Sequence, residues 1–388
     1  MVKTTSTPAL ELETYEIIGV ERLLTPALAI YMDIVDRNIE TMVELLGGEA
    51  QRWRPHIKTS KIAKVMSRLI ERGVRHFKCA TTLELRTLCE LGAADVLMAY
   101  PSLGARGRRV RDLASQFPKV RVSTVVDSID EIEAWRGSPV DLFIDINPGM
   151  DRTGTDQMRD ELIITLAQTI KDAEIRFRGL HYYDGHHRQA ELNERTRAAH
   201  AGYDQLLGLI RRLESQGIRV EEVITAGTPA LPCSLSYSGF HNQSFFHRVS
   251  PGTVVYGDMT SRAQLPADWD FRPAALVVST IVSQPTKSMV TCDAGHKTVS
   301  ADAGIPNCEV LGHPEMEPQP PSEEHLPLKI RNGSAVPKLG SALYLLPRHI
   351  CPTVNNFDHA LLVEKGQILG VTDVTARGRE NPLSTSRD

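Results

Sequence analysis

Residues 141–183 read DLFIDINPGMDRTGTDQMRDELIITLAQTIKDAEIRFRGLHYY, and they hold a strand pattern, a helix pattern and a second strand pattern in that order. The two outer runs, DLFIDI and FRGLHYY, are short and rich in β-forming residues. The run DELIITLAQTIKDA between them is longer and amphipathic, which predicts a helix. Strand, helix and strand in one stretch is typical of the βαβ unit of a parallel sheet.

The alternation continues on both sides of this unit, from residue 27 to residue 227. The candidate strands are residues 28–32, 53–57, 75–79, 95–99, 120–126, 141–146, 177–183 and 222–227. Their number is the one that closes a (β/α)8 barrel. A doubly wound open sheet would show the same alternation, but no G-x-G-x-x-G motif follows the first strand. We therefore expect an α/β fold built on a TIM-like barrel.

The last third of the chain has a different character. Short β-rich runs, among them AALVVSTIVSQP, SALYLLP and HALLVEKGQILGV, are separated by Gly, Pro and Asn, which predicts an antiparallel β domain. We expect the barrel to span residues 24–258, and the β domain to comprise residues 1–23 and 259–388. Within this domain, the Pro- and Glu-rich run 313–328 is predicted to be an exposed loop.

The composition excludes several classes of protein. The formal net charge of −4 and the pI of about 6.4 do not support a global nucleic-acid surface. No stretch approaches the roughly 20 apolar residues that cross a bilayer, and the N-terminus lacks the apolar core of a secretory signal. The six cysteines are scattered without a C-x-x-C pair, which favours reduced thiols. We expect a cytoplasmic protein without nucleic-acid or membrane partners.

The basic stretch RWRPHIKTSK, residues 52–61, holds the first candidate reactive group. Lys58 comes one residue after the apolar end of a predicted strand, and alternation places His56 on the same side. Reactive groups of a barrel lie where strands end and loops begin, so Lys58 is predicted to face the barrel mouth. Ser60 is predicted to cap the next helix, which places Lys61 on its solvated face. The alternative is that Lys58 is an ordinary surface lysine.

A second cluster follows the strand at 177–183. Tyr183, Asp184, His186 and His187 lie within five residues at a change from strand to loop. These side chains are candidate proton carriers, and their number exceeds what packing requires. The alternative is a tyrosine in the core beside two histidines that face solvent.

Glycine-rich turns after strands form a third group. TAGTP (225–229) and SPGTVVYGD (250–258) lie where barrels commonly gather backbone N–H groups around a phosphate. NPGMDRTG (147–154) is a further loop at a strand end and carries Arg152. Any βα turn can hold glycine, so the location of these turns is more informative than their composition.

The fourth group is PRHICPTVNNFDH in the predicted β domain. His349 and Cys351 are two residues apart, so in an extended segment their side chains point the same way. An imidazole nitrogen with a thiolate sulfur is a pair that suits zinc, and an open catalytic site could complete its shell with water and substrate. The alternative is a buried free cysteine beside a surface histidine.

Taken together, RPHIKTSK, GMDRTG, DAGHKTVSAD (293–302) and PRHICPTVN resemble the D-threonine aldolase / D-serine dehydratase family. These are pyridoxal phosphate enzymes of fold type III, related to alanine racemase, and the resemblance covers residues 20–375. It implies a barrel that holds pyridoxal 5'-phosphate and a β domain that adds a divalent metal (Zn, Mn or Mg). It further implies a small D-β-hydroxy-amino-acid substrate and a homodimer.

The resemblance also implies roles for individual residues. Lys58 matches the lysine that forms the Schiff base. Independently of the resemblance, cationic neighbours such as His56, Arg52 and Arg54 are expected to keep it unprotonated. Tyr183 and Arg152 match residues near the cofactor. The remaining implied contacts are Thr228, Gly252, Thr253 and Tyr256 for the phosphate, and His349 with Cys351 for the metal.

Three departures from the family pattern concern the reaction. The phosphate turn reads TAGTP in place of a run of glycines, Ala80 stands where a glutamine is expected, and the metal motif is H-x-C. The cofactor prediction is unaffected. The H-x-C motif is associated with D-serine dehydratases, whereas aldolases carry H-x-D.

Two reactions are therefore considered. In the aldolase, Asp184, His186 or His187 removes the β-hydroxyl proton, and the Cα–Cβ bond breaks to give glycine and an aldehyde. In a D-serine or 3-hydroxy-D-aspartate dehydratase, Lys58 removes the Cα proton, and a 2-oxo acid and ammonia form. The cluster of candidate bases favours the aldolase, and Cys351 favours the dehydratase. A racemase would need no metal at a β-hydroxyl, and non-catalytic cofactor-binding proteins lack the β domain.

Overall fold

The structure is a computed structural model that describes residues 10–331 and 334–383, so the predicted β-domain segment 1–23 is described from residue 10 onward. Its contacts divide the chain into two compact units. The first, called the barrel unit, comprises Val43–Lys58, Leu69–Gly252 and Gly378–Asp388. The second, called the β unit, comprises Met1–Met42, Thr59–Arg68 and Thr253–Arg377.

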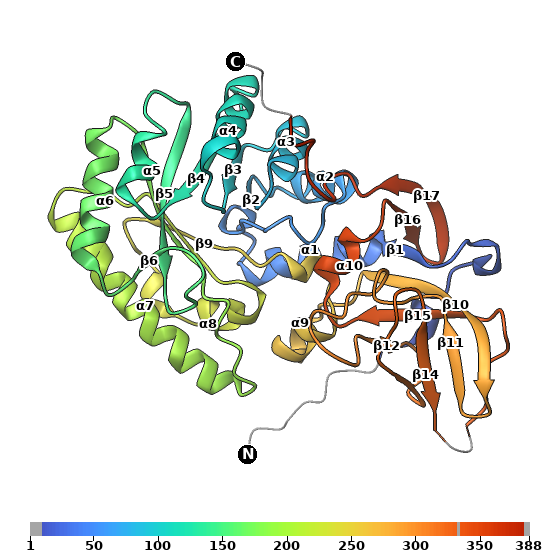
Figure 1. Cartoon of the computed structure of the whole chain (residues 1–388). Helices are drawn as coiled ribbons and strands as arrows, with labels where there is room; N and C mark the ends of the chain where they lie inside the picture. Colours follow the sequence, from blue (N-terminus) through green and yellow to red (C-terminus); the bar gives the residue numbers. More distant parts are fainter. Residues whose placement is uncertain (1–9, 332–333, 384–388) are drawn as a thin grey trace. The chain divides into compact units, whose positions relative to one another are not determined.

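The barrel unit is built on a parallel sheet with the strand order β2-β3-β4-β5-β7-β8-β9 (Figure 1). These strands are β2 (His76–Cys79), β3 (Asp95–Met98), β4 (Arg121–Val126), β5 (Val140–Asn147), β7 (Phe177–Tyr182), β8 (Glu222–Thr225) and β9 (Phe246–Val249). The two-residue β6 (Thr155–Asp156) pairs only with β5. Nearly every strand residue is buried, as expected where helices cover one face and a barrel core fills the other.

The segment 53–57 closes this sheet into a barrel. Trp53 forms a parallel bridge with Val249 of β9, and His56 forms one with Lys78 of β2. The Ile57 N–H donates to the Lys78 carbonyl at 2.9 Å, and the Lys78 N–H donates to the Pro55 carbonyl at 2.9 Å. Pro55 has no N–H to donate, which explains why bridges replace a regular strand here. The segment adds the last stave to the seven strands of the sheet, and the predicted barrel is confirmed.

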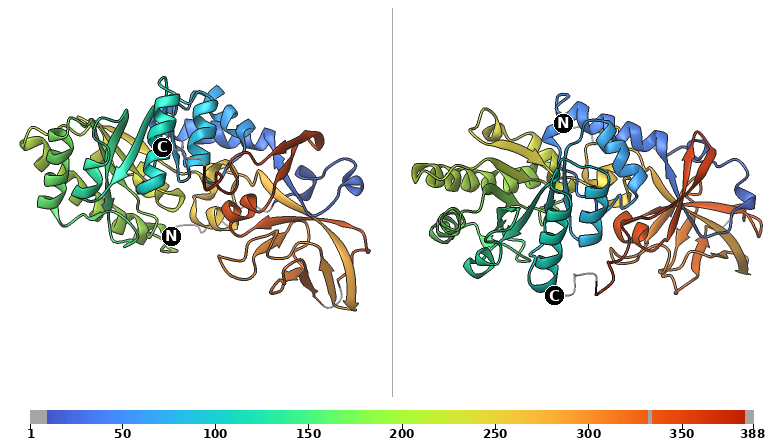
Figure 2. Two further views of the ribbon diagram at one scale, coloured as in Figure 1. Left: turned by 45° about the horizontal axis from the view of Figure 1, so that its top comes forward. Right: turned by 90° about the horizontal axis from the view of Figure 1, so that it is seen from above.

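The helices of the barrel unit are α3 (Thr82–Glu90), α4 (Gly104–Gln116), α5 (Ile129–Glu133), α6 (Asp160–Asp172), α7 (Leu192–Ser215) and α8 (Leu231–Leu235). Figures 1 and 2 show α3, α4, α6 and α7 along the outside of the parallel strands. Helix α6 buries Ile163, Ile164, Leu166, Ala167 and Ile170, which follow one helix face. The βαβ unit expected within 141–183 is therefore present as β5, α6 and β7.

One predicted barrel strand lies elsewhere. Strand β1 (Ala27–Tyr31) was expected to open the barrel, but it pairs antiparallel with β10 and parallel with β16 in the sheet of the β unit. An almost fully buried apolar strand gives the same sequence signal in either sheet, so periodicity could not assign it. The place left open in the barrel count belongs to β9, which the sequence did not identify.

The β unit holds the second sheet, with the order β13-β14-β11-β10-β1-β16-β17 and with β15 pairing both β10 and β12. Its further strands are β10 (Ala275–Thr286), β11 (Met289–Cys292), β12 (Cys308–Val310), β13 (Met316–Pro318), β14 (Leu326–Ile330), β15 (Ala342–Pro347), β16 (His359–Glu364) and β17 (Gln367–Asp373). Among the strands that the structure describes in this sheet, only β1 and β16 pair in parallel, so the predicted antiparallel β domain is confirmed. The run 313–328 was expected to be a loop, but it contains β13 and the start of β14.

The remaining helices are α1 (Met32–Leu45), α2 (Ala63–Glu71), α9 (Met259–Gln264) and α10 (Ile350–Asn355). Helix α2 begins later than predicted, so Ser60 is not its cap. Lys61 is also not a solvated helix residue, because it is 5% exposed with φ of 47° and its Nζ donates to the Ala376 carbonyl. A lysine that pairs with a distant carbonyl carries no local sequence signal. Gly73 follows the helix, with φ of 87°.

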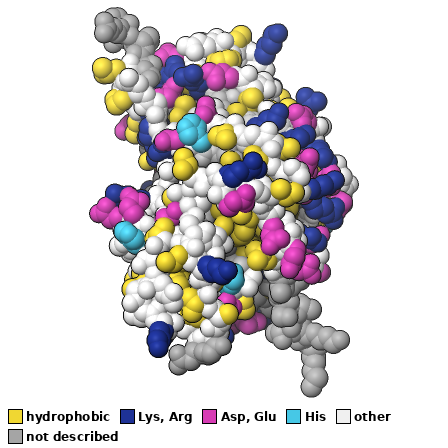
Figure 3. All heavy atoms as spheres, turned by 90° about the vertical axis from the view of Figure 1, so that its right-hand side faces the viewer, with side chains coloured by type: hydrophobic (Ala, Val, Ile, Leu, Met, Phe, Trp, Pro, Cys, Tyr) yellow, Lys and Arg dark blue, Asp and Glu magenta, His cyan; other side chains and the backbone are white. Residues whose placement is uncertain are grey.

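The surface shows no dominance of one charge on the face drawn in Figure 3, where Lys and Arg side chains are interspersed with Asp and Glu. This agrees with a net charge close to neutral. Among the described residues, no helix combines the length and apolar character needed to cross a bilayer.

A cluster of buried charges lies inside the barrel. Arg54 is 0% exposed and contacts Asp95 of β3 at 2.7 Å and Glu222 of β8 at 2.8 Å. Arg178 reaches both carboxylates, and Arg248 reaches Glu222 at 2.6 Å. Burial alone would raise the pKa of Glu222, but Arg54 and Arg248 outweigh it and hold this pKa below its usual value. The closing segment is thus tied to strands on both sides of the barrel.

Replacing Glu222 should therefore destabilise the barrel unit strongly. We expect Glu222→Ala to lower the free energy of unfolding by about 3–5 kcal/mol, because three arginines lose a shared buried partner. The matched control is Glu221→Ala, which removes an exposed pair with Arg176 and should cost about 0–1 kcal/mol. Denaturant titration of both variants measures the difference. Equal losses would show that the buried cluster does not hold the barrel together.

Candidate active site

Most of the predicted cofactor residues follow strands of the barrel at the same end. Lys58 follows the closing segment, Arg152 follows β5, Tyr183 follows β7, Thr228 follows β8 and Gly252 follows β9. The ends of parallel strands meet at one rim, which is where barrel enzymes carry their chemistry. With β1 removed from the count, the two glycine-rich turns follow the seventh and eighth staves, the usual phosphate position in such barrels.

The backbone around Lys58 is tightly fitted. The Lys58 side chain is half-buried, and its Nζ takes part in no hydrogen bond with the described residues. Its N–H donates to Nδ1 of His56 at 3.3 Å, so the His56 ring turns back onto its own chain. A Cβ at Gly252 would lie 2.1 Å from the His56 carbonyl oxygen. Only glycine therefore allows the turn after β9 to approach the closing segment.

A second lysine lies at this end of the barrel, and the sequence reading gave it no role. Lys78 of β2 is 2% exposed, and its Nζ donates to Ser250 Oγ at 2.7 Å and to His181 Nε2 at 3.1 Å. Nδ1 of His181 pairs with Asp145 Oδ1 at 2.7 Å. Burial, followed by the positive charge of Lys58, lowers the pKa of Lys78 to about 7. A lysine inside a buried parallel strand is the signal that could have drawn attention to it.

Tyr183 is the ring around which these groups gather. The guanidinium carbon of Arg152 lies 4.9 Å from its ring centroid, and Nζ of Lys78 lies 5.4 Å from it. A Cβ at Gly227 would come within 3.0 Å of the ring, and one at Gly185 within 2.4 Å of its hydroxyl. The ring is thus held between two glycine backbones and faces two cations.

Asp184 is bound more firmly than a free base would be. It is 0% exposed; Oδ2 accepts from the Tyr203 hydroxyl on α7, and Oδ1 accepts from the Gly227 N–H at 3.2 Å. Burial raises the pKa of Asp184 to about 6. The carboxylate therefore ties the loop after β7 to α7 and to the turn after β8.

His186 and His187 present unused polar atoms. Their ring centroids lie 4.0 Å apart, and Nδ1 of each is buried without a hydrogen-bond partner, as is Oε1 of Gln189. Burial lowers the pKa of both histidines, that of His187 to about 4. Both imidazoles are therefore neutral at neutral pH. Unpaired buried polar atoms call for an explanation, and a polar ligand or a water molecule in this loop would supply one.

The predicted metal pair lies in the β unit. His349 precedes α10 and Cys351 lies inside it, so the extended segment expected from the sequence is wrong. The two side chains nevertheless meet: the hydrogen bond with the Cys351 sulfur, together with Asp302, raises the pKa of His349 to about 9. The Asp302 carboxylate lies 2.7 Å from Nδ1 of His349. Among the described residues, no group of three or more His, Cys, Asp or Glu side chains could hold a metal.

Two threonines approach Cys351. Oγ1 of Thr59 lies 3.0 Å from its Sγ, and Oγ1 of Thr253 lies 3.8 Å from it. Thr59 is the chain neighbour of Lys58, and Thr253 that of Gly252. Tyr256 is 0% exposed and donates its hydroxyl to the Ser60 carbonyl at 2.8 Å, so that hydroxyl is already engaged.

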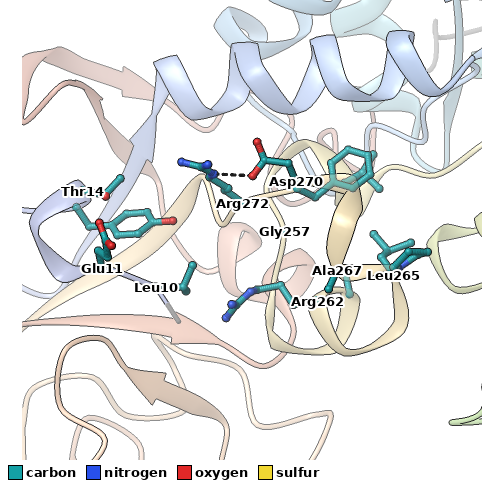
Figure 4. Close-up of a pocket in the computed structure, with 14 residues that line it drawn as sticks. Leu10, Glu11, Thr14, Gly257, Arg262, Leu265, Ala267, Asp270 and Arg272 are labelled. Carbon is teal, nitrogen blue, oxygen red and sulfur yellow. Dashed lines mark hydrogen bonds and ion pairs between the residues drawn. The ribbon is translucent and has the colours of Figure 1, made fainter. Parts of the chain in front are cut away.

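A hollow of about 300 Å³ lies in the β unit. Figure 4 shows Leu10, Arg262, Asp270 and Arg272 among the residues that line it. None of the residues predicted to bind a cofactor or metal lines it.

Comparisons with known proteins identify the family of this chain. The family model described as "Alanine racemase, N-terminal domain" matches residues 30–260, which is more than half of the chain. The chain belongs to this family. A second family model, "Putative serine dehydratase domain", matches residues 274–363 of the same chain. The fold-type III resemblance expected from the sequence is confirmed by the two matches.

Individual relatives resemble the chain over most of its length, but at low sequence identity. A D-threonine aldolase of Arthrobacter sp. is 25% identical, over 92% of this chain and 93% of that one. A D-threo-3-hydroxyaspartate dehydratase of Delftia sp. is 23% identical, over 86% and 92%. The crystal structure of D-threonine aldolase from Filomicrobium marinum has a TM-score of 0.84 and 27% identity, and the match covers 92% of this chain and 97% of that one.

The raised pKa of Asp184 predicts a pH-dependent effect of its neighbour. Tyr203→Phe removes a hydrogen bond to the Asp184 carboxylate. At pH values above the Asp184 pKa, this loss should lower the free energy of unfolding by about 1.5–3 kcal/mol. The native Asp184 is protonated below its pKa of about 6, so the cost should shrink as the pH falls to about 5. Unfolding at several pH values measures this.

The control for this prediction is Tyr237→Phe. Tyr237 donates to Asp204, an exposed carboxylate that water can solvate, so its loss should cost less. A Tyr203→Phe cost that is the same at every pH would contradict the assignment of the titration to Asp184.

Proposed function

We propose that the chain is a pyridoxal phosphate-dependent lyase that cleaves D-β-hydroxy-α-amino acids to glycine and an aldehyde. The observation that carries this proposal is the gathering of Lys58, Lys78, Tyr183 and Arg152 at one end of the barrel. The relatives support it, since they are aldolases and a dehydratase of such amino acids. Both reaction types belong to lyases.

The barrel residues suit the cofactor by their chemistry. Lys58 offers an amine whose Nζ no described residue holds by a hydrogen bond. Tyr183 offers a half-buried ring that a planar group can stack against, with Arg152 beside it. The Gly252 turn is shaped by a contact that no Cβ would allow, as expected where backbone must approach a phosphate. Thr228 and Thr253 would complete the phosphate contacts.

The chain's own residues would then divide the work. When bound, pyridoxal phosphate supplies an electron sink that weakens the bonds at the substrate Cα. Lys58 would bond the cofactor and give way to the substrate amine. Tyr183 and Arg152 would fix the plane and the charge of the ring. The buried position of Asp184 would keep the loop after β7 in place beside them.

The proton of the substrate hydroxyl would pass to a histidine of the loop after β7. His186 and His187 are neutral at neutral pH, so each imidazole can accept a proton, but burial weakens His187 as a base by lowering its pKa to about 4. Asp184 is less suited, because both of its oxygens already accept hydrogen bonds. This histidine pair is the observation that favours carbon–carbon cleavage.

A dehydratase is the second candidate, and the contact of His349 with Cys351 favours it. A nitrogen and a sulfur ligand suit a divalent metal, and the Asp302 carboxylate on the other imidazole nitrogen is typical of metal-binding histidines. Two ligands are fewer than the three protein ligands of most catalytic zinc sites. We retain the pair as the proposed metal site and derive no catalytic step through it.

The choice between the two lysines of the basic stretch gives a first prediction. Lys58→Ala should lose the visible absorption of the bound cofactor, because no amine remains at the end of the closing segment. Lys61→Ala is the matched control, since Lys61 is a buried lysine engaged by the Ala376 carbonyl. Spectra of both variants after incubation with the cofactor give the answer. Loss of absorption in Lys61→Ala alone would overturn the proposal.

The products distinguish the two reactions. With D-threonine, we expect glycine and acetaldehyde as the main products rather than 2-oxobutanoate and ammonia. One of the variants His186→Gln and His187→Gln should lower this cleavage by about 10²–10⁴-fold, the usual contribution of a general base. Chromatography of the products with and without a chelator measures both the reaction and its metal requirement. Predominant 2-oxobutanoate would establish the dehydratase instead.

A further inference from the structure

The Cys351 sulfur differs from the other thiols of the chain in its access to solvent. All six cysteines lie in the described ranges, and Cys351 is the one that is not buried. The proposed partner of this sulfur is oriented by a chain of hydrogen bonds. Nδ1 of His349 lies 2.7 Å from Oδ2 of Asp302, and Oδ1 of the same carboxylate accepts from the Ser300 hydroxyl at 2.8 Å. The imidazole of the proposed metal pair is therefore held by its neighbours, and the sulfur needs a corresponding partner.

Thr59 provides that partner. Its Oγ1 lies 3.0 Å from Sγ of Cys351, although 292 positions separate the two residues in the sequence. Thr59 directly follows Lys58, whereas Cys351 lies in α10, and both Thr59 and Cys351 belong to the β unit. Thr59 is 0% exposed, so the packing around its side chain fixes the position of the hydroxyl. Oγ1 of Thr253 lies farther from the sulfur, at 3.8 Å.

The direction of the hydrogen bond follows from the burial of Thr59. A hydroxyl carries one proton and two lone pairs. Among the described residues, the Thr59 hydroxyl has one hydrogen-bond partner, which is the Cys351 sulfur. If the sulfur were the donor, the hydroxyl proton would be buried without an acceptor, which is unfavourable. The hydroxyl is therefore the donor, and the sulfur is the acceptor.

A cysteine that binds a metal needs this direction. A metal ion takes cysteine sulfur as the thiolate, which has no proton to donate and can only accept hydrogen bonds. A hydrogen bond that the sulfur accepts is therefore kept when a metal binds, whereas one that the sulfur donates would be lost. Side chains that hydrogen-bond to a ligand also fix its orientation toward the metal. The hydroxyl of Thr59 thus suits a thiolate ligand.

We propose that the Thr59 hydroxyl positions the Cys351 sulfur as a ligand for a divalent metal ion by donating a hydrogen bond to it. Thr59 acts through Cys351, as Asp302 acts through His349, and is a positioning residue. The inference rests on the proposed function in one respect, that His349 and Cys351 are the metal pair. It assigns no step of the reaction to the metal.

Zinc binding by the whole chain tests the inference without any measurement of turnover. The protein with pyridoxal phosphate is freed of metal by a chelator and is then titrated with Zn²⁺ against a chromophoric chelator. Thr59→Val keeps the branched shape and removes the hydroxyl, so it should bind zinc about 10-fold to 100-fold more weakly than the unaltered protein. Thr59→Ser keeps the hydroxyl and should regain most of this loss.

The matched control is Thr41→Val. Thr41 is 4% exposed in α1 of the β unit, and its hydroxyl has no hydrogen-bond partner in the part of the chain that the structure describes. Zinc affinity should be unaltered in this variant, because the hydroxyl that it removes is not bonded to the sulfur. Denaturant titration and the visible absorption of the cofactor show that each variant is folded and loaded.

Cobalt gives a second readout, which reports the bond between metal and sulfur. Co²⁺ shows a charge-transfer absorption when a thiolate binds it, and Cys351→Ala should lack this band. In Thr59→Val, at saturating Co²⁺, the band should move to longer wavelength. The reason is that a hydrogen bond stabilises the sulfur electrons that the transition moves to the metal. Thr59→Ser should return the band toward its original position.

The outcomes separate the inference from the proposed function. Zinc affinity and a cobalt spectrum that Thr59→Val leaves unaltered would overturn the inference. An equal loss of affinity in Thr59→Ser and Thr59→Val would also overturn it, because the loss would not follow the hydroxyl. Unaltered zinc affinity in Cys351→Ala would instead overturn the proposed metal pair, on which the inference rests. The cofactor lysine is tested by the absorption lost in Lys58→Ala, a signal that Thr59→Val should retain.

Discussion

The ion pairs of Arg54 are the interaction on which the site depends. The segment 53–57 has few backbone hydrogen bonds to its neighbouring strands, because Pro55 cannot donate one. Side-chain ion pairs therefore help to hold the segment where backbone hydrogen bonds would hold a regular strand. Arg54 joins Asp95 of β3 to Glu222 of β8 from within the barrel. Because buried charges are stable only when paired, this cluster fixes the segment in one position. Lys58 directly follows this segment, so the position of its backbone depends on the same ion pairs.

The rim above this cluster is polar in a particular way. Its carboxylates are engaged, Asp145 by His181 and Asp184 by Tyr203, while Lys58 and Arg152 keep their cationic groups available. A rim with engaged acids and available cations suits an anionic ligand. The loop after β7 adds neutral imidazoles to the same rim. Charge and proton acceptance are therefore supplied by different strands of one barrel.

The sequence predicted the fold class and grouped most of the rim residues, because alternation and strand ends are local patterns. It failed where the decisive partner is distant. Strand β1 has the apolar signal of a barrel strand but pairs with β10 and β16. Lys61 is buried and donates a hydrogen bond to the carbonyl of Ala376, which is distant in the sequence. Helix α10 begins where an extended segment was expected. Lys78 was missed because the side chains that bind it, Ser250 and His181, come from distant parts of the sequence.

The contact between Gly252 and the His56 carbonyl shows how a hydrogen atom in place of a side chain can shape a rim. Residue 252 bears no functional group, yet any larger residue would press against the backbone two positions before Lys58. In a library that randomises the rim, variation at Thr228 or His186 would alter chemistry and leave a folded barrel. A larger residue at position 252 would add side-chain volume without adding a reactive group, and it would displace Lys58 by pressing on the His56 backbone. The tolerance of residue 252 to substitution would therefore report how closely the turn after β9 packs against the segment 53–57, independently of any reaction.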